Sequence, residues 1–333
     1  MRFYVQKLLF YVAAFWAALT LNFLIPRMMP GDPVSIILMK LAASGQPVTP
    51  ETRQAIAIQL GGIGEGSWQS QYWRYLGNLA HGDLGVSISN YPVKVTDILQ
   101  QALPWTITLI GLATVIAFLA GISLGIFAGW KRGSWLDNLI PAATAFQSVP
   151  YFWLALVLLL VFSRYLQWFP LGQGYDTMAF PILHPGLNWP FLSSAAYHAV
   201  LPALTIVLSS VAGWMLGMRN MMVSTLSEDY ILTAQAKGLK PGRVRFTYAA
   251  RNAVLPSLSG FAISLGFVVA GSIVTEQVFS YPGIGFQMWK AVSNNDYPLM
   301  QGTFLVISVA VLGANLLVDL LLGLIDPRTR ARS

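Results

Sequence analysis

In the second half of this sequence, ionisable side chains gather in one hydrophilic stretch, where they are suited to binding another molecule. Six of the twenty Lys and Arg residues lie between Arg219 and Arg251. Within this stretch Ser227, Glu228 and Asp229 precede a short run that ends with Lys237 before a glycine. Serine is a favoured helix N-cap, acidic residues suit the first helical turn, and lysine followed by glycine suits a helix end. We therefore predict a short helix from Glu228 to Lys237, capped by Ser227.

The predicted helix can offer a close-fitting surface to a partner. Ala234, Ala236 and Gly238 leave part of it with almost no side chain, so a groove on another protein could approach its backbone. Pro241 can open a second helix, because proline is tolerated in a first helical turn. An ordinary basic loop between two helices fits the same residues, and on physical grounds both interpretations stay open.

Other patterns that carry chemistry are missing. The sequence contains no Gly-x-x-x-x-Gly-Lys-Ser/Thr loop, which is the usual cradle for nucleotide phosphates. It has no cysteine, and its three histidines, His81, His184 and His198, show no spacing typical of metal ligands. No clustered pair of acids suggests hydrolysis. We expect no catalytic residue, metal site or cofactor in this chain, so any ATP energy must come from another polypeptide.

Composition places these residues in a membrane protein. Hydrophobic residues make up 55% of the chain and charged residues 10%, against about 25% charged in a soluble domain. The mean hydropathy is +0.59. Apolar runs long enough to cross ~30 Å of hydrocarbon recur along the chain, and each must be helical because lipid offers no partner for backbone groups. We predict an all-α integral membrane protein with six transmembrane helices, at 8–25, 104–130, 138–163, 199–218, 252–275 and 302–325.

The basic residues predict the orientation of these spans. Thirteen Lys and Arg residues would lie on the side of the two termini and seven on the other side, five of them in a loop too long to count for much. The termini are therefore expected in the cytoplasm. The predicted parts are 1–25, with the first span; 26–103, an extracytoplasmic loop with short amphipathic helices; and 104–333, a five-helix core with a cytoplasmic loop at 219–257. This bias also explains the net charge of +7 without a nucleic-acid partner.

The long outer loop has helix signals of its own. Thr49, Pro50 and Glu51 can begin a short helix, and Gly61 with Gly62 can end it. A second helix follows with an apolar stripe, which could lie on the outer membrane surface, pack on the spans or contact a partner. Packing at the interface is preferred over partner contact. Its residues are Trp68, Tyr72, Tyr75, Leu76 and Leu79. The aromatic segment 164–197 is similarly interpreted as an interfacial belt, with direct contact to substrate or to a binding protein as the alternative.

Small and polar residues inside the spans suggest further contacts. Glycines repeat at intervals of four, at Gly121, Gly125 and Gly129 and at Gly213 and Gly217, which favours close helix packing. Glu276 and Asp319 sit near span ends, where solvation of the helix end is the simplest interpretation. Six polar residues are candidates for a substrate path, although serine in a membrane helix often bonds its own backbone. They are Gln147, Ser148, Ser209, Ser210, Ser272 and Thr275.

The hydrophilic stretch resembles a known motif. The run from Glu228 to Gly238, EDYILTAQAKG, followed by Arg251-Asn252-Ala253 and Leu255-Pro256, resembles the EAA loop of ABC importer permeases in the peptide and nickel family. The strict Glu-Ala-Ala triplet is replaced by Leu232-Thr233-Ala234, as in the peptide branch. Other matches to the first-subunit permease of that family (the dipeptide/oligopeptide permease B type) span nearly the whole chain: Pro30-Gly31-Asp32-Pro33, Tyr72-Trp73, Gly82-Asp83-Leu84-Gly85, Tyr281-Pro282-Gly283-Ile284-Gly285, Asp296-Tyr297-Pro298, Gln301-Gly302 and Asp326-Pro327-Arg328.

The resemblance implies a type I ABC importer permease in a bacterial cytoplasmic (inner) membrane. It implies a second homologous permease, two ABC ATPase subunits or a fused ATPase that use ATP and Mg, and an extracytoplasmic substrate-binding protein. Short peptides are the expected cargo, with nickel chelates or oligosaccharides as alternatives, and an ATP-independent secondary carrier is the alternative outside the family. The residues implied in ATPase coupling are Glu228, Asp229, Tyr230, Thr233, Ala234, Ala236, Lys237, Gly238 and Leu239.

Overall fold

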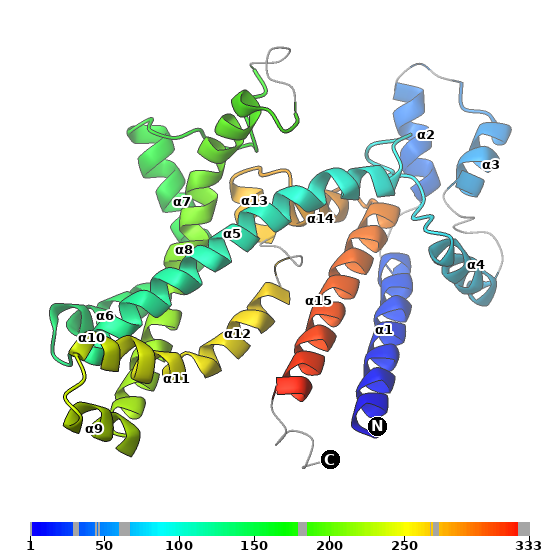
Figure 1. Ribbon diagram of the computed structural model, residues 1–333. Helices are drawn as coiled ribbons and strands as arrows, with labels where there is room; N and C mark the ends of the chain where they lie inside the picture. The colour runs from blue at the N-terminus through cyan, green and yellow to red at the C-terminus, as the bar shows by residue number, and fades with distance from the viewer. Residues whose placement is uncertain are drawn as a thin grey trace.

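The protein is built from helices around one long crossing pair (Figure 1). The computed structural model describes residues 2–28, 33–43, 45, 47–59, 67–178, 185–266, 268 and 273–325. Within these ranges the only β pairing is an isolated antiparallel bridge between Val86 and Lys94. The expected all-α architecture is confirmed for the described residues.

The crossing pair consists of α5 (Val95–Trp130) and α8 (Trp189–Leu226). A Cβ atom added at Gly125 of α5 would lie 2.6 Å from the carbonyl oxygen of Met215 and 2.7 Å from the Cβ of Met218, both on α8. Gly121 and Gly129 meet α8 equally closely. The close packing predicted for this glycine repeat is confirmed, because only glycine lets the two backbones approach so far.

The second glycine repeat does not serve the same purpose. A Cβ atom at Gly217 would meet nothing within 4 Å, and one at Gly213 would lie 3.1 Å from the Nε2 of Gln147 on α6 (Trp135–Gln147). Within this chain Gly217 therefore makes no close backbone contact, and the packing predicted for it stays a prediction about another chain. On the α8 side of the crossing with α5, larger side chains such as Met218 fill the contact.

Four helices among the described residues are long and apolar enough to cross a membrane, with apolar stretches at Val5–Ile25, Val95–Trp130, Trp189–Leu226 and Tyr297–Leu316. Two of these helices begin before the predicted starts of their spans, at 104 and 199. Pro104 lies inside α5 and Pro202 lies inside α8, so neither proline ends a helix. Proline removes one backbone donor, but membrane helices tolerate this where neighbouring groups satisfy the freed carbonyl.

The third and fifth predicted spans are made of shorter pieces. The third consists of α6, α7 (Tyr151–Leu158) and the π-helix η1 (Leu159–Tyr165), and Pro150 separates α6 from α7. The fifth contains α12 (Leu255–Gly266) and α13 (Ile273–Val278), and most of the residues between these two helices lie outside the described ranges.

The first and last long helices, α1 (Arg2–Met28) and α15 (Tyr297–Ile325), lie side by side (Figure 1). The Nζ of Lys7 donates to Asp319 over 2.6 Å, and the hydroxyl of Tyr11 donates to the same carboxylate oxygen over 2.8 Å. Solvation was therefore the wrong interpretation of Asp319, since its carboxylate ties α1 to α15 by an ion pair.

The 26–103 loop, predicted to lie outside the membrane, is partly helical in its described residues, and it packs on the rest of the chain. It contains α2 (Pro33–Ala43), α3 (Pro50–Gln59) and α4 (Trp68–Ala80). The hydroxyl of Thr49 accepts the backbone N–H of Thr52 over 3.2 Å, which confirms the predicted start of α3, while Gly61 and Gly62 lie outside the described residues. The sequence did not predict α2, because its run of apolar residues shows little periodicity.

The apolar stripe of α4 packs on α1, which was one of the alternatives to a place on the membrane surface. The ring of Tyr72 lies edge-on to Phe23 at 5.1 Å, and its hydroxyl shares a hydrogen bond of 2.9 Å with Thr20. The amide of Asn22 donates to the hydroxyl of Tyr75 over 3.2 Å. These contacts fix the outer loop against the first span.

Two buried carboxylates position the outer segments. Asp296 is fully buried and accepts the hydroxyl of Ser87 over 2.5 Å and the backbone N–H and hydroxyl of Ser89 over 2.8 and 2.6 Å. It also accepts the N–H of Leu299 over 3.2 Å, so it links the turn after α4 to the start of α15. A carboxyl group shielded from water is tolerated there because several donors replace the solvent.

Glu276 of α13 is the second buried carboxylate. It accepts the hydroxyl of Thr106 over 2.8 Å and the backbone N–H of Phe286 over 3.0 Å. The Oγ1 of Thr106 in turn accepts the N–H of Ile284 over 2.7 Å, at the start of α14 (Ile284–Ser293). Helix-end solvation was therefore the wrong interpretation of Glu276, which is completely shielded and joins α5, α13 and α14.

Candidate functional site

The hydrophilic stretch forms a short helix, α9 (Asp229–Ala236), at the end of α8 (Figure 1). Ile231 is fully buried, and Ala234 is 3% exposed. Both belong to a buried cluster that contains Met218 and Met222 of α8 and Val244 of the following π-helix η2 (Val244–Ala250). Two small apolar contacts therefore anchor α9 to the end of a long helix.

This anchoring corrects the predicted role of Ala234. The sequence placed Ala234 on a bare outer face with Ala236 and Gly238, but its methyl group points into the protein. The exposed face is made by other residues: Ala236 and Gly238 are exposed, and Leu232 shows 54% of its surface. Ala234 and Ile231 are three positions apart, which puts them on one side of a helix, whereas Ala236 lies on another side.

The beginning of α9 also differs from the prediction. Glu228 is the N-cap, and its side chain makes no capping hydrogen bond. Ser227 instead donates its hydroxyl to the carbonyl of Ser224 over 2.7 Å, at the end of α8. Ser227 therefore terminates the preceding helix, because a serine can bond backward to a free carbonyl as readily as forward to a free N–H.

The end of α9 matches the prediction. Gly238 has a φ of +72°, and its N–H donates to the carbonyl of Gln235 over 2.9 Å. The N–H of Leu239 donates to the carbonyl of Ala234 over 3.3 Å. This pair of bonds is the Schellman motif, which requires a left-handed residue that glycine adopts without strain. Leu239 packs on the same buried cluster as Ala234, so the turn after α9 is held as firmly as the helix.

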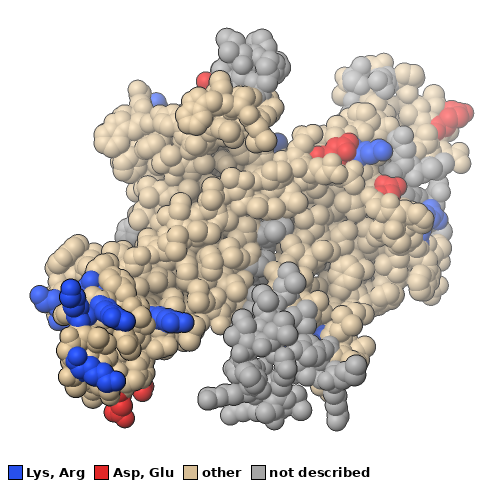
Figure 2. Space-filling view, in the orientation of Figure 1, with Lys and Arg blue, Asp and Glu red and all other residues tan. Residues whose placement is uncertain are grey.

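The exposed face of α9 presents groups that suit a protein contact. Tyr230 is 39% exposed, and its hydroxyl accepts the amide of Asn252 over 3.1 Å. Thr233 donates to the carbonyl of Asp229 over 2.9 Å. The residues beyond are exposed and basic, with Lys237 at the helix end. Figure 2 shows Lys and Arg side chains gathered over the end of the molecule where α9 and α10 lie.

The segment after α9 returns the chain to the long helices. Pro241 opens α10 (Pro241–Arg243), as predicted, and the chain continues through η2 and α11 (Arg251–Ala253) into α12. Val244, Ala249, Ala250 and Ala253 face the same buried cluster as α9. A displacement of α9 would therefore be passed directly to α8 and, through this segment, to α12.

An ion pair braces α8 at the same end. The Nε–H of Arg219 donates to one carboxylate oxygen of Asp137 on α6 over 2.8 Å, and an Nη2–H of Arg219 donates to the other oxygen over 3.3 Å. The hydrogen bond from Arg219 lowers the pKa of Asp137, and the backbone N–H of Gly133 adds to the effect. The pair holds α6 against α8 close to the α9 anchor.

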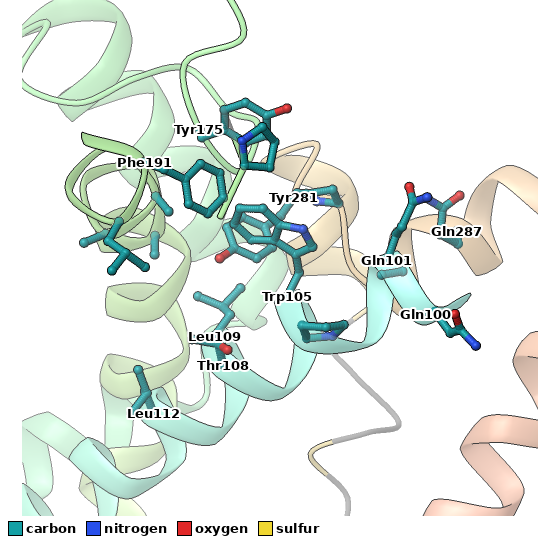
Figure 3. Close-up of a pocket in the computed structure, with 18 of the residues that line it drawn as sticks. Gln100, Gln101, Trp105, Thr108, Leu109, Leu112, Tyr175, Phe191, Tyr281 and Gln287 are labelled. Carbon is teal, nitrogen blue, oxygen red and sulfur yellow. The ribbon is translucent and has the colours of Figure 1, made fainter. Parts of the chain in front are cut away.

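A cavity of about 1240 Å³ lies at the opposite end of α5 and α8. Its aromatic wall is shown in Figure 3: Trp105 stacks on Tyr175 at 6.1 Å between ring centres, and it meets Phe191 and Tyr281 edge-on at 5.9 and 5.5 Å. Leu109 and Leu112 extend the lining along α5.

Most of the polar side chains that line the cavity are amides. Gln100, Gln101 and Gln287 lie to one side of the rings in Figure 3, Thr108 lies beside Leu109 on α5, and Asn90 and Lys290 complete the polar lining. Amides can both donate and accept hydrogen bonds, and the ammonium group of Lys290 can pair with a carboxylate. The arrangement suits a ligand that combines apolar side chains with peptide groups.

The aromatic outer segment is divided between two roles. Tyr175 and Phe191 line the cavity, whereas Trp168 and Trp189 show 58% and 80% of their surface, as a belt would require. Phe180 lies outside the described residues. The four rings of the cavity wall are scattered between positions 105 and 281, and no local pattern in the sequence could bring them together.

Five of the six polar residues predicted to line a substrate path lie in the described part of the chain, and none of these five lines this cavity. Ser209 donates to the carbonyl of Thr205 over 2.7 Å, and Ser148 donates to Thr144 over 3.4 Å, so both bond their own helix. Thr275 is fully buried. Gln147 is exposed and Ser210 half-buried, while Ser272 lies outside the described residues.

The stretch Gly121-Ile122-Ser123-Leu124-Gly125 has the Gly-x-Ser-x-Gly spacing of a hydrolase nucleophile turn. That motif requires a sharp turn between a strand and a helix, which exposes the serine. Here the whole run lies inside α5, and its glycines contact α8. It is therefore a packing pattern.

Comparison with known proteins places the chain in a family. Residues 121–331 match the model for "Binding-protein-dependent transport system inner membrane component". The chain is 34% identical over 342 residues to the di/tripeptide transport system permease protein DppB of Pseudomonas aeruginosa, and this match covers 98% of each chain. It is 32% identical to the oligopeptide transport system permease protein AppB of Bacillus subtilis, over 92% of each chain, and 32% identical to the dipeptide transport system permease protein DppB of Escherichia coli K12, over 99% of each. The chain therefore belongs to the binding-protein-dependent transport system inner membrane components, as a multi-pass ABC transporter permease and not an ATPase.

Proposed function

We propose that this chain is a permease subunit of an ATP-driven importer of short peptides. Together with a second homologous permease it forms the translocation path, and an extracytoplasmic substrate-binding protein delivers the cargo. The cargo assignment is supported by three relatives that are named as peptide permeases and are similar to this chain over 92% or more of its length. The single observation that carries the mechanism is α9, a well-terminated helix anchored on one side and exposed on the other.

In this proposal α9 is the element that receives force from an ATPase. Exposed positions on α9 and at its two ends would contact one of two ATPase subunits or the matching half of a fused ATPase, among them Glu228, Asp229, Tyr230, Thr233, Ala236, Lys237 and Gly238. Ala234 and Leu239 would hold α9 to α8 and η2. ATP and Mg bound by the ATPases would move α9 as a rigid lever and shift the path between inward and outward access.

The proposed topology has six spans with both termini in the cytoplasm and the 26–103 loop outside. The basic side chains over α9 and α10 in Figure 2 support this orientation, since positive residues are retained on the cytoplasmic side. The cavity near Trp105 is then on the outer side, where cargo would arrive. Its aromatic rings, amides and single lysine suit peptides, with nickel chelates and oligosaccharides as alternative cargoes.

The proposal is tested by uptake into proteoliposomes. The permease, its paired permease and the ATPases from the same operon are reconstituted with the cognate binding protein and a radiolabelled dipeptide. We expect uptake that requires ATP inside the vesicles and is competed by unlabelled dipeptide but not by a nickel chelate or an oligosaccharide. Uptake that persists without ATP would instead support a secondary carrier, and competition by one of the other ligands would replace the peptide assignment.

A further inference from the structure

Arg245, at the start of η2, is a cation enclosed by aromatic rings. The carbon of its guanidinium group lies 4.5 Å from the ring centre of Phe246, 4.9 Å from that of Phe127 and 5.8 Å from that of Trp130. Phe127 and Trp130 form the last turn of α5, whereas Phe246 belongs to η2. The contact of η2 with α5 thus places a positive charge beside the end of a membrane-crossing helix.

The guanidinium group lacks an acceptor within the described part of the chain. Its Nε is buried and has no hydrogen-bond partner there. Ring faces attract a cation, but they do not accept the directed hydrogen bonds of its five N–H groups. The side chain as a whole is only half-buried, so a group from outside the chain can reach it, and an acceptor for the buried Nε–H would remove an unfavourable unpaired donor.

More positive charge surrounds this position. Lys131 and Arg132 follow directly after Trp130 and are exposed, and Arg243 is exposed two residues before Arg245. The carboxylate of Asp137, five residues after Arg132, is already bonded to Arg219. The acceptor that fits this surface is therefore an anion.

Large apolar side chains are exposed next to the same charges. Trp135 shows 73% of its surface, Phe246 47% and Phe127 43%. Because α5 is apolar enough to cross a membrane and its apolar run ends at Trp130, we expect these side chains near the level where hydrocarbon gives way to headgroups. Exposed rings beside cations at that depth favour a lipid over a soluble anion, since the acyl chains can cover the rings while the phosphate meets the cations.

We propose that Arg245, with Lys131, Arg132 and Arg243, binds the phosphate of an anionic phospholipid headgroup. The site is separate from the exposed face of α9, and it does not depend on which cargo the transporter carries. A lipid held between the end of α5 and η2 would brace the segment that joins α9 to α12. The positive-inside bias accounts for basic residues on this side, but it does not require a caged arginine without an acceptor.

The test measures lipid retention by the purified full-length permease with its partner subunits. Native mass spectrometry compares phosphatidylglycerol with phosphatidylcholine for the wild type, Arg245→Gln, Arg245→Lys and Lys131→Gln/Arg132→Gln. Arg74→Gln is the matched control, because Arg74 is an exposed arginine on α4 in the outer loop. We expect the wild type to prefer phosphatidylglycerol, about a five-fold loss for each removed charge at the site, partial retention in Arg245→Lys, and no change in the control.

Each other outcome counts against the site. Equal retention of the two lipids by the wild type, or wild-type retention in both charge-removing variants, would overturn it. An equal loss in Arg74→Gln would show that net charge alone governs lipid binding. If Arg245→Gln does not assemble, the exposed double variant alone decides the matter. If the variants keep the lipid but lose the ATPase, the anion is a carboxylate of that partner and the lipid proposal fails.

Discussion

The backbone N–H of Leu239 donates to the carbonyl of Ala234 over 3.3 Å and closes α9 immediately after Gly238. The same two residues pack in one buried cluster, so this turn fixes both the end of the helix and its position against α8. The coupling role proposed for α9 requires a rigid element that can transmit force, and this relationship would provide the rigidity.

The first prediction concerns Gly238, whose φ of +72° strains any residue with a Cβ. We expect Gly238→Val to destabilise the turn by about 1–2 kcal/mol and to reduce ATP-driven uptake. Gly242→Ala is the control, because Gly242 is exposed and a Cβ there would meet nothing within 4 Å. Thermal unfolding in detergent and uptake in proteoliposomes check both. Equal behaviour of the two variants would argue against the importance of this turn.

The second prediction separates the anchor of α9 from its docking face. Ala234→Trp places a large ring inside the buried cluster. We expect the free energy of unfolding to fall by about 1–3 kcal/mol and little protein to be recovered. Ala236→Trp, on the exposed face, should leave thermal stability unchanged but weaken copurification of the ATPase. Normal ATPase binding by Ala236→Trp would show that this part of α9 is not covered in the complex.

The third prediction tests the crossing of α5 and α8. Gly125→Leu inserts a side chain where a Cβ would already lie 2.6 Å from the carbonyl oxygen of Met215, so the helices must separate. We expect little intact protein in size-exclusion chromatography. Gly217→Leu carries the same change to a position with open space and should be recovered normally. Similar recovery of the two variants would contradict the observed crossing.

The fourth prediction concerns Asp296. Removing its carboxylate in Asp296→Ala leaves the hydroxyls of Ser87 and Ser89 and two backbone N–H groups without their acceptor. We expect a destabilisation of at least about 2 kcal/mol and faster proteolysis of the outer turn. Asp83→Ala removes an exposed carboxylate that bonds only the nearby N–H of Gly85, and it should resist protease like the wild type. Equal cleavage of both variants would exclude a special role for the buried carboxylate.

The fifth prediction is a pH dependence of the brace between Asp137 and Arg219. Because the folded-state pKa of Asp137 is lowered, its contribution to stability is complete above the ordinary carboxyl pKa of about 3.9 and is lost as the pH falls through the lower folded value. The difference in melting temperature between the wild type and Asp137→Asn should therefore be constant near neutral pH and shrink below about pH 4. A difference that does not change down to pH 3 would show that the brace is not ionic.

The sequence alone determined the features that depend on local order. The helical membrane class follows from apolar runs that must satisfy their own backbone, and the end of α9 follows from Lys237 and Gly238, because a left-handed turn favours glycine. The glycine repeat of α5 predicted a close contact, since the spacing itself places the small residues on one side of a helix. The ordered motifs also indicated the family before any geometry was known.

Tertiary structure decided which side of each element is occupied. Spacing could not show that Ala234 faces inward while Ala236 faces outward, because both are small, and the choice depends on Met218 and Met222 of another helix. Likewise Glu276 sits at a helix end in the sequence but is shielded by donors from α5 and α14, and the rings around the outer cavity come from positions 105 to 281. Contacts between residues so far apart are set by the packing of whole helices, which local patterns do not encode.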